Sequence, residues 1–196
     1  VLGLLLVLGV GVRLAFYGSV PPMLNPDSAG YYVPARNLVY GDGFDLGLRR
    51  TPTYPLFLAG VIAFVGEDLQ KIVTVQHFIF GPLLISLIYL LGRLTTTRLA
   101  ALLAAALVAI SGPLLLYEHY VMTEIPFGIL LLALLSSFLL LVKRASLSWA
   151  PIAGLFFGLL VLCRPSGQIL APLVLGMLLL LPGGWRRRVT AAGLLA

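Results

Sequence analysis

Long apolar runs dominate the chain, and short polar segments separate them. A membrane-spanning helix needs about 20 predominantly apolar residues, so this pattern predicts an all-α, polytopic transmembrane protein with about six to seven spans. The runs predict spans over roughly Val1–Tyr17, Gln70–Gly92, Leu99–Tyr117, Ile125–Val142, Trp149–Cys163 and Ser166–Leu181, with Val189–Ala196 beginning a seventh. The chain starts without a Met and stops inside an apolar stretch, so we expect it to be a fragment, or the ordered part, of a longer protein.

The segment after the first run has a different character. Residues 18–51 contain Pro21, Pro22, Pro26 and Pro34 together with three aspartates and several tyrosines, which predicts a long, structured loop. Pro52–Val65 is apolar but only about 14 residues long, too short to span, and is expected to lie in the membrane interface. We therefore treat residues 1–196 as one transmembrane portion, with residues 18–69 as a first outer loop that carries interfacial helices.

Composition narrows the function classes. Hydrophobic residues make up 60% of the 196 residues and charged residues 10%, and the mean hydropathy is +1.07. Soluble domains are about 45–50% apolar and about 25% charged. The composition therefore excludes soluble enzymes, nucleic-acid-binding modules, intrinsic disorder and disulfide scaffolds. Cys163 is the single cysteine, so the chain holds no internal disulfide.

Charges alternate between the connectors that join the predicted spans. Three connectors contain only basic charges, and the acids occupy the others. The positive-inside rule places the basic connectors in the cytoplasm and the long loop outside, as in a multi-pass plasma-membrane protein. The basic residues are Arg93, Arg98, Lys143, Arg144 and Arg186–Arg188, and the acids are Asp27, Asp42, Asp45, Glu67, Asp68, Glu118 and Glu124.

Two arginines occur next to apolar runs. Arg13 lies near the end of the first predicted span, where its side chain is expected to snorkel to the interface. Arg164 joins two predicted helices of about 15–16 residues, or about 23 Å each, shorter than the hydrocarbon core of about 30 Å. Arg164 is therefore expected below the outer surface, where it either binds an anion or caps helix-end carbonyls. A salt bridge to Glu118 or Glu124 is a competing arrangement.

Two outer acids are candidates for chemistry. Asp27 either caps a helix over Ser28–Tyr40 or acts in catalysis, and Val33 before Pro34 favours extended geometry there. Glu124 begins a predicted span, where Thr123 or Glu124 itself can cap the helix or the carboxylate can face an outward-opening cavity. We predict that Asp27 and Glu124 face the same cavity.

The remaining polar residues of the outer side favour structural roles. Asp42 in Gly-Asp-Gly is typical of a turn, and Glu67-Asp68 mark an interface before a span. His119 beside Glu118 is either a metal ligand or an ordinary interfacial histidine. His77 lies inside a predicted span and is expected to be a packed polar residue.

Three motifs carry a family resemblance. They are Arg50-Thr51-Pro52-Thr53-Tyr54-Pro55-Leu56-Phe57-Leu58-Ala59 at the end of the acid-bearing loop, then Thr123-Glu124-Ile125-Pro126-Phe127, then Arg164-Pro165-Ser166-Gly167. In this order and topology the chain resembles the N-terminal half of GT-C superfamily glycosyltransferases. It is similar to bacterial relatives of dolichyl-phosphate-mannose protein mannosyltransferases and to lipid A aminoarabinose transferases.

The resemblance implies an enzyme of the bacterial plasma membrane that moves a sugar from a polyprenyl-phosphate carrier to an acceptor on the outer face. It implies Asp27 and Glu124 as catalytic residues, and Arg164, Tyr31, Arg50 and Tyr54 as substrate-binding residues. No cofactor is assigned, and a divalent metal at Glu124 stays open. The expected partners are the lipid-linked donor and the bilayer.

Two other function classes compete with an enzyme. Many relatives carry two adjacent acids where this chain has Asp27-Ser28, which favours a non-catalytic GT-C-like subunit of a larger membrane complex as the alternative. A secondary transporter fits poorly, because transporters place ionisable residues near the midplane and the acids here lie in outer loops.

Overall fold

A computed structural model describes residues 1–47, 50–179, 181–182 and 184–195, and the regular elements in these ranges are all helices. The expected all-α class is therefore confirmed. The elements are α1 (Leu2–Ser19), α2 (Ala29–Tyr40), α3 (Thr53–Val65), α4 (Leu69–Thr95), α5 (Arg98–Ala109), α6 (Gly112–His119), α7 (Glu124–Lys143), α8 (Trp149–Cys163), a 3-10 helix η1 (Pro165–Leu170), α9 (Ala171–Leu179) and α10 (Trp185–Leu195).

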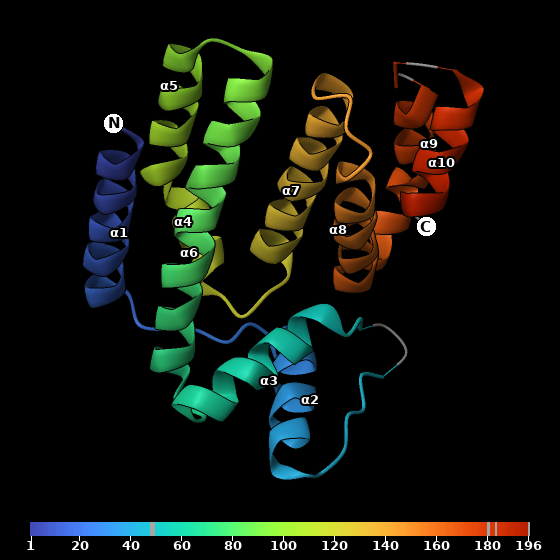
Figure 1. Cartoon of the computed structure of the whole chain (residues 1–196). Helices are drawn as coiled ribbons and strands as arrows, with labels where there is room; N and C mark the ends of the chain where they lie inside the picture. Colours follow the sequence, from blue (N-terminus) through green and yellow to red (C-terminus); the bar gives the residue numbers. More distant parts are fainter. Residues whose placement is uncertain (48–49, 180, 183, 196) are drawn as a thin grey trace.

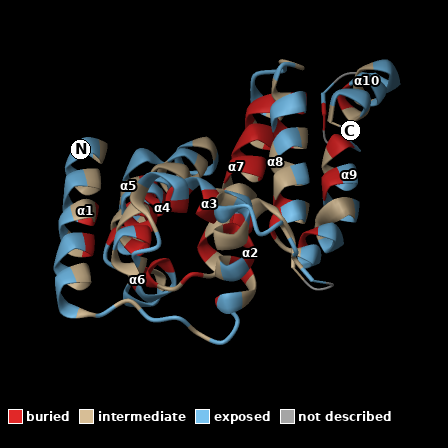
Figure 2. Ribbon diagram, turned by 90° about the horizontal axis from the view of Figure 1, so that it is seen from below, coloured by how far each residue is buried: buried red, intermediate tan, exposed pale blue. Residues whose placement is uncertain are grey.

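The long helices run side by side, and α4 lies at the centre of one group. It packs against α1, α5 and α7, while α7 packs against α8 and α8 against α10 (Figure 1). Large apolar residues stay exposed, for example Leu4, Leu103 and Leu107. Exposed stretches run along the ribbons of α1 and α5 in Figure 2. Exposed apolar faces of this extent indicate contact with lipid or another membrane protein.

Within the described part of the chain, three helices, α1, α4 and α7, are long and apolar enough to cross a membrane. The pair α5 and α6 adds a fourth if it forms one broken span, because the two axes differ by 53°. Gly112-Pro113 begin α6 at this break, and proline cannot donate to the preceding turn. The apolar helices of Trp149–Cys163 and Pro165–Leu179 are shorter. The larger count of six to seven spans stays a prediction.

The first outer loop folds as a layer of two helices beneath the ends of the long ones. Figure 1 shows α3 lying across these ends, as expected for an interfacial helix and not for a spanning one. Residues of α2 and α3 share a buried cluster with α4 and α7, which fixes this layer to the bundle. The cluster includes Tyr31, Ala35, Tyr54, Leu58, Ile62, Ile72, Val73, Phe80, Ile125 and Ile129.

Local expectations for α2 were partly wrong. The helix continues through Val33 and Pro34, so the extended geometry expected at Val33 does not occur. Ser28 occupies the N-cap position and no side chain caps the helix there, so the capping alternative for Asp27 is wrong. The helix ends at Gly41 with φ 86°, a left-handed conformation that glycine adopts without a steric penalty.

The bundle separates the two kinds of connector. The α4–α5 and α7–α8 turns, which carry Arg93, Arg98, Lys143 and Arg144, lie at one end, whereas α2, α3 and the α6–α7 connector lie at the other (Figure 1). The predicted alternation of basic and acidic connectors therefore matches the fold. We call the end with α2, α3 and the α6–α7 connector the acidic end. There Asp68 caps α4 by accepting hydrogen bonds from the amides of Gln70 and Lys71.

Candidate functional site

An ion pair between Asp27 and Arg50 lies at the acidic end of the bundle. Nη2 of Arg50 donates to Oδ1 of Asp27 at 2.7 Å, and this hydrogen bond is the main reason that the pKa of Arg50 is raised above its usual value. Arg50 therefore stays protonated and holds the carboxylate in place. The close approach needs Gly30, where an added Cβ would lie 2.6 Å from Nε of Arg50.

Tyr31 contacts Arg50 directly, and Tyr54 packs behind Tyr31. Nη1 of Arg50 donates to the hydroxyl of Tyr31 at 2.9 Å, and its guanidinium lies 4.5 Å from the centre of the Tyr31 ring. The ring of Tyr54 meets that of Tyr31 edge to face at 5.5 Å. Tyr54 itself is only 1% exposed, and its hydroxyl donates to Oε1 of Gln76. Tyr54 is thus placed to support the site from within the core.

Glu124 and Arg164 form a second ion pair. Glu124 is the first residue of α7, and its Oε1 accepts a hydrogen bond from Nη1 of Arg164 at 3.1 Å. This is one of the two salt bridges expected as a competitor to anion binding. Arg164 is extended, with φ −153°, between α8 and η1 and is 43% exposed. Thr123 takes the N-cap position of α7, but no side-chain capping bond forms there.

Two threonines, one just before α3 and one at its first residue, connect the end of α8 to the layer of α2 and α3, here called the outer layer. The hydroxyl of Thr51 donates to the carbonyl of Cys163 at 2.8 Å, and that of Thr53 donates to the carbonyl of Leu159 at 3.3 Å. The hydroxyls of Tyr31 and Thr123 lie 3.5 Å apart. The motif that follows Arg50 therefore holds Arg164 near the segment that carries Glu124.

A cleft of about 490 Å³ opens beside Glu124. Its walls combine aromatic, apolar and polar side chains from α6, the α6–α7 connector and the outer loop. Asp27 does not line it, but Asn25 does, and Oδ1 of Asn25 accepts a hydrogen bond from the amide of Asp27 at 2.7 Å. A cavity shared by Asp27 and Glu124 stays a prediction. The lining residues are Asn25, Gly112, Pro113, Leu116, Tyr117, Tyr120, Met122 and Glu124.

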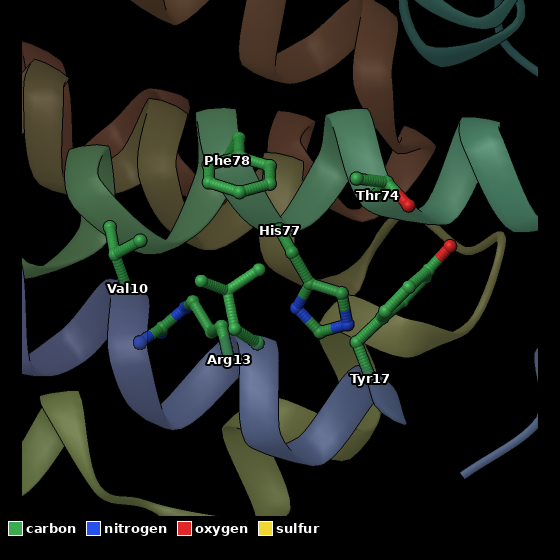
Figure 3. Close-up of a pocket in the computed structure, with 7 residues that line it drawn as sticks. Val10, Arg13, Tyr17, Thr74, His77 and Phe78 are labelled. Atoms are coloured by element: carbon green, nitrogen blue, oxygen red, sulfur yellow. The ribbon is translucent and has the colours of Figure 1, made fainter. Parts of the chain in front are cut away.

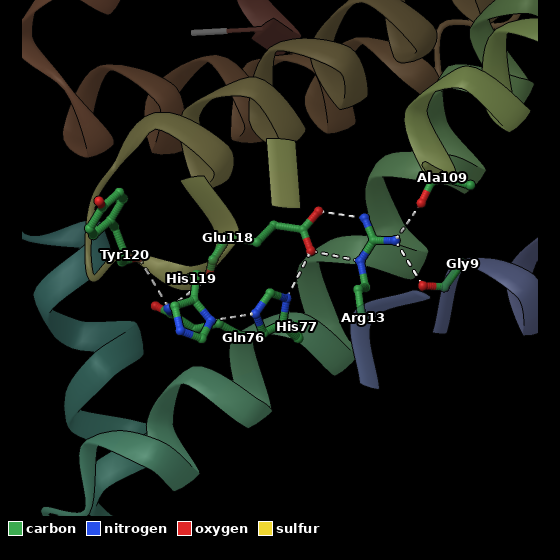
Figure 4. Close-up of polar contacts among 8 residues, drawn as sticks. All are labelled: Gly9, Arg13, Gln76, His77, Ala109, Glu118, His119 and Tyr120. Carbon is green, nitrogen blue, oxygen red and sulfur yellow. Dashed lines mark hydrogen bonds and ion pairs between the residues drawn. The ribbon is translucent and has the colours of Figure 1, made fainter. Parts of the chain in front are cut away.

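A buried polar network lies deeper in the bundle, and sequence reasoning missed it (Figure 4). Arg13 is 3% exposed and donates from Nε and Nη2 to the carboxylate of Glu118 at 2.6 and 2.5 Å. The expectation that Arg13 snorkels to the interface is therefore wrong. A cation within an apolar span signals a buried partner, and this signal was available in the sequence.

Two histidines extend this network. Nδ1 of His77 lies 3.2 Å from Oε2 of Glu118, and Nε2 of His77 lies 3.1 Å from Nδ1 of His119. His77 is thus the packed polar residue that was expected. Both carboxylate oxygens of Glu118 accept hydrogen bonds from Arg13. Across the described residues, no three His, Cys, Asp or Glu side chains gather as metal ligands.

A small pocket adjoins the network between α1 and α4 (Figure 3). Its volume is about 10 Å³, close to the space that one water molecule needs. Arg13, Tyr17, Thr74 and His77 line it together with apolar residues. The pocket is far too small to hold a sugar or a lipid, so it is not the candidate site.

The comparisons identify the family of the chain. The family model described as dolichyl-phosphate-mannose-protein mannosyltransferase matches residues 49–195, which include Arg50, Glu124 and Arg164, whereas Asp27 precedes the match. No curated protein matches the chain. The family match covers most of the chain and fits a helical membrane fold. The chain therefore belongs to the dolichyl-phosphate-mannose-protein mannosyltransferase family and is a membrane glycosyltransferase of the GT-C type.

Proposed function

We propose that this protein transfers a sugar from a polyprenyl-phosphate carrier to a hydroxyl or amine acceptor at the acidic end of the bundle. The observation that carries the proposal is the proximity of two ion pairs, Asp27–Arg50 and Glu124–Arg164, which Tyr31 and Thr123 connect. The acceptor atom attacks the anomeric carbon, and the bond from that carbon to the phosphate oxygen breaks. The acceptor proton goes to a carboxylate, and the lipid phosphate leaves as an anion.

Asp27 is the proposed general base. Its side chain is 64% exposed, so an acceptor can reach it. Arg50 binds Oδ1 and thereby orients the carboxylate, which leaves Oδ2 to accept the proton of the acceptor. A base that is fixed in this way needs only hydrogen-bond distance to the reacting group. Tyr31 acts with Arg50 because it holds the guanidinium by its ring and its hydroxyl.

Arg164 is the proposed phosphate ligand. A phosphate is a good leaving group, so its departure needs a cation more than a general acid. The planar guanidinium can bind two phosphate oxygens, and the partly exposed side chain uses only Nη1 for Glu124. Glu124 either orients Arg164 and the acceptor or binds a divalent metal, and these alternatives stay open.

The lipid chain of the donor needs an apolar path that reaches this site. A cleft of about 140 Å³ between α3, α4 and α7 has almost wholly apolar walls. It begins at Thr53 and Tyr54, next to the polar residues, and extends along the bundle, so we assign it to the polyprenyl chain. The lining residues are Thr53, Tyr54, Phe57, Phe80, Leu83, Pro126, Ile129 and Leu130.

The proposed location is the bacterial plasma membrane. The charge distribution supports an orientation with the acidic end facing the periplasm or exterior. Basic connectors are retained in the cytoplasm during insertion. A non-catalytic GT-C-like subunit of a larger complex is the second candidate, favoured by the single acid at Asp27-Ser28.

Replacing the proposed base tests the function directly. In reconstituted full-length protein, Asp27→Asn should abolish transfer of a radiolabelled sugar from polyprenyl phosphate, while binding of the labelled donor persists. Asp42→Asn is the matched control, because Asp42 lies in the turn after α2. Full turnover by Asp27→Asn would reject the proposed base, and absence of transfer by the unaltered protein would favour the non-catalytic subunit.

A further inference from the structure

Gln76 on α4 joins the two halves of the candidate site. The residue is fully buried, and its amide group meets three partners from other segments. Oε1 accepts the hydrogen bond from the Tyr54 hydroxyl, and Nε2 donates to the carbonyls of Glu118 and Tyr120 at 3.3 Å each. Both amide hydrogens are therefore used, and the orientation of the amide is fixed by the chemistry of its partners.

The contacts of Oε1 connect Gln76 to one ion pair, and the contacts of Nε2 connect it to the other. Tyr54 packs against Tyr31, which holds Arg50 and through it Asp27. The carbonyl of Tyr120 belongs to the connector that ends at Glu124, and this carbonyl also accepts a hydrogen bond from the amide of Met122 at 3.0 Å. The direct link between Tyr31 and Thr123, at 3.5 Å, is longer than an ordinary bond between hydroxyls.

We propose that Gln76 is a positioning residue that sets the separation of the Asp27–Arg50 and Glu124–Arg164 pairs, and this proposal rests on the proposed function. Oε1 of Gln76 binds the outer layer through Tyr54, and Nε2 binds the α6–α7 connector through the carbonyl of Tyr120. An enzyme that takes a proton at one pair and releases a phosphate at the other needs a fixed spacing, because a shift of about 1 Å can lower the rate about 100-fold.

The chemistry of the amide separates this role from simple packing. Gln76→Glu keeps the volume and can still accept from Tyr54, but a carboxylate cannot donate to the carbonyls of the connector. Gln76→Met removes both links and fills a similar space. Tyr54→Phe removes only the hydroxyl that links α3 to Gln76. Ser137→Ala on α7 is the control, because Ser137 is also buried and bonds only the carbonyl of Ala133 in its own helix.

The kinetic test uses full-length protein in proteoliposomes. We expect Gln76→Glu and Gln76→Met to lower kcat about 10- to 100-fold while the KM for the polyprenyl-phosphate sugar changes less than about twofold. Gln76→Met combined with Tyr54→Phe should be no slower than Gln76→Met alone, because Gln76→Met already breaks the link that Tyr54→Phe removes. Unchanged kcat in folded Gln76→Met, or an equal loss in Ser137→Ala, would overturn the proposal.

A distance measurement tests the positioning role without any transfer reaction. Spin labels replace Val33 on α2 and Tyr117 on α6, both well exposed, in a Cys163→Ser background. Gln76→Met should broaden or shift the distance distribution between the labels, and Ser137→Ala should not. If Gln76→Met broadens the distribution but the unaltered full-length protein transfers no sugar, the proposed function is rejected and the positioning role is kept. An unchanged distribution would reject the positioning role alone. If Gln76→Met does not fold, Tyr54→Phe decides both measurements by the same criteria.

Discussion

Arg13 and Glu118 are 105 positions apart in the sequence and share two hydrogen bonds of 2.6 and 2.5 Å inside the bundle. The arginine also donates from Nη1 to the carbonyls of Gly9 and Ala109. The contact fixes α1 against the end of α6, directly before the connector that leads to Glu124. Charges within a membrane protein are expensive unless they pair, so each of these two buried charges needs the other.

Replacing one residue of the Arg13–Glu118 pair should destabilise the protein more than replacing both. We expect Arg13→Met or Glu118→Leu alone to lower the free energy of unfolding by about 3–5 kcal/mol, because each leaves a buried charge without its partner. The double variant should lose less than either single variant. Thermal unfolding of the purified protein measures this order. Arg36→Met is the control, since the Arg36–Glu67 pair is exposed, and its unfolding temperature should barely change. A double variant less stable than both singles would contradict the prediction.

Gly81 on α4 should not tolerate a methyl group. An added Cβ would lie 1.9 Å from Nε of Arg13, which cannot move away because Glu118 holds it. Gly81→Ala should lower the free energy of unfolding by about 1–3 kcal/mol, as overpacking does. Gly128→Ala on α7 has open space around its Cβ and should cause no loss. The prediction fails if Gly81→Ala is as stable as Gly128→Ala, or if the loss persists when Arg13 is replaced by alanine.

Arg164 should contribute to turnover more than to folding. Arg164→Lys keeps the charge but loses the planar fork, so kcat at saturating donor should fall while the unfolding temperature stays the same. Arg164→Ala should lower kcat further. Transfer kinetics in reconstituted full-length protein measure both variants. Unchanged kinetics in Arg164→Ala would reject phosphate binding by this residue.

The position of α3 at the membrane surface can be measured by fluorescence. Phe64 on α3 is 91% exposed, and Leu103 on α5 is exposed on the side of the bundle. Tryptophan at position 64 should be quenched best by lipids brominated near the headgroup. Tryptophan at position 103 should be quenched best by bromine deep in the acyl chains. Deep quenching at position 64 would mean that α3 enters the hydrocarbon core.

The sequence by itself determined the class of protein, most helix positions and the family. Apolar runs of spanning length, a short apolar helix at Pro52–Val65 and the alternation of charged connectors each follow from local composition, so they could be found without coordinates. The motifs around Arg50, Glu124 and Arg164 also lie in continuous stretches of sequence. Their order along the chain was sufficient to identify the family.

Only the tertiary structure decided which charges meet. Asp27 was compatible with capping or catalysis, and the fold directs its carboxylate to Arg50, 23 positions further along the chain. Arg13 was expected at the interface, but it lies inside the bundle, where it pairs with Glu118. Pairing energies depend on distance and burial, not on sequence separation, so no local pattern could select these partners. Gln76 shows the same dependence, because an amide in an apolar helix gains its role only when Tyr54 and the α6–α7 connector pack around it.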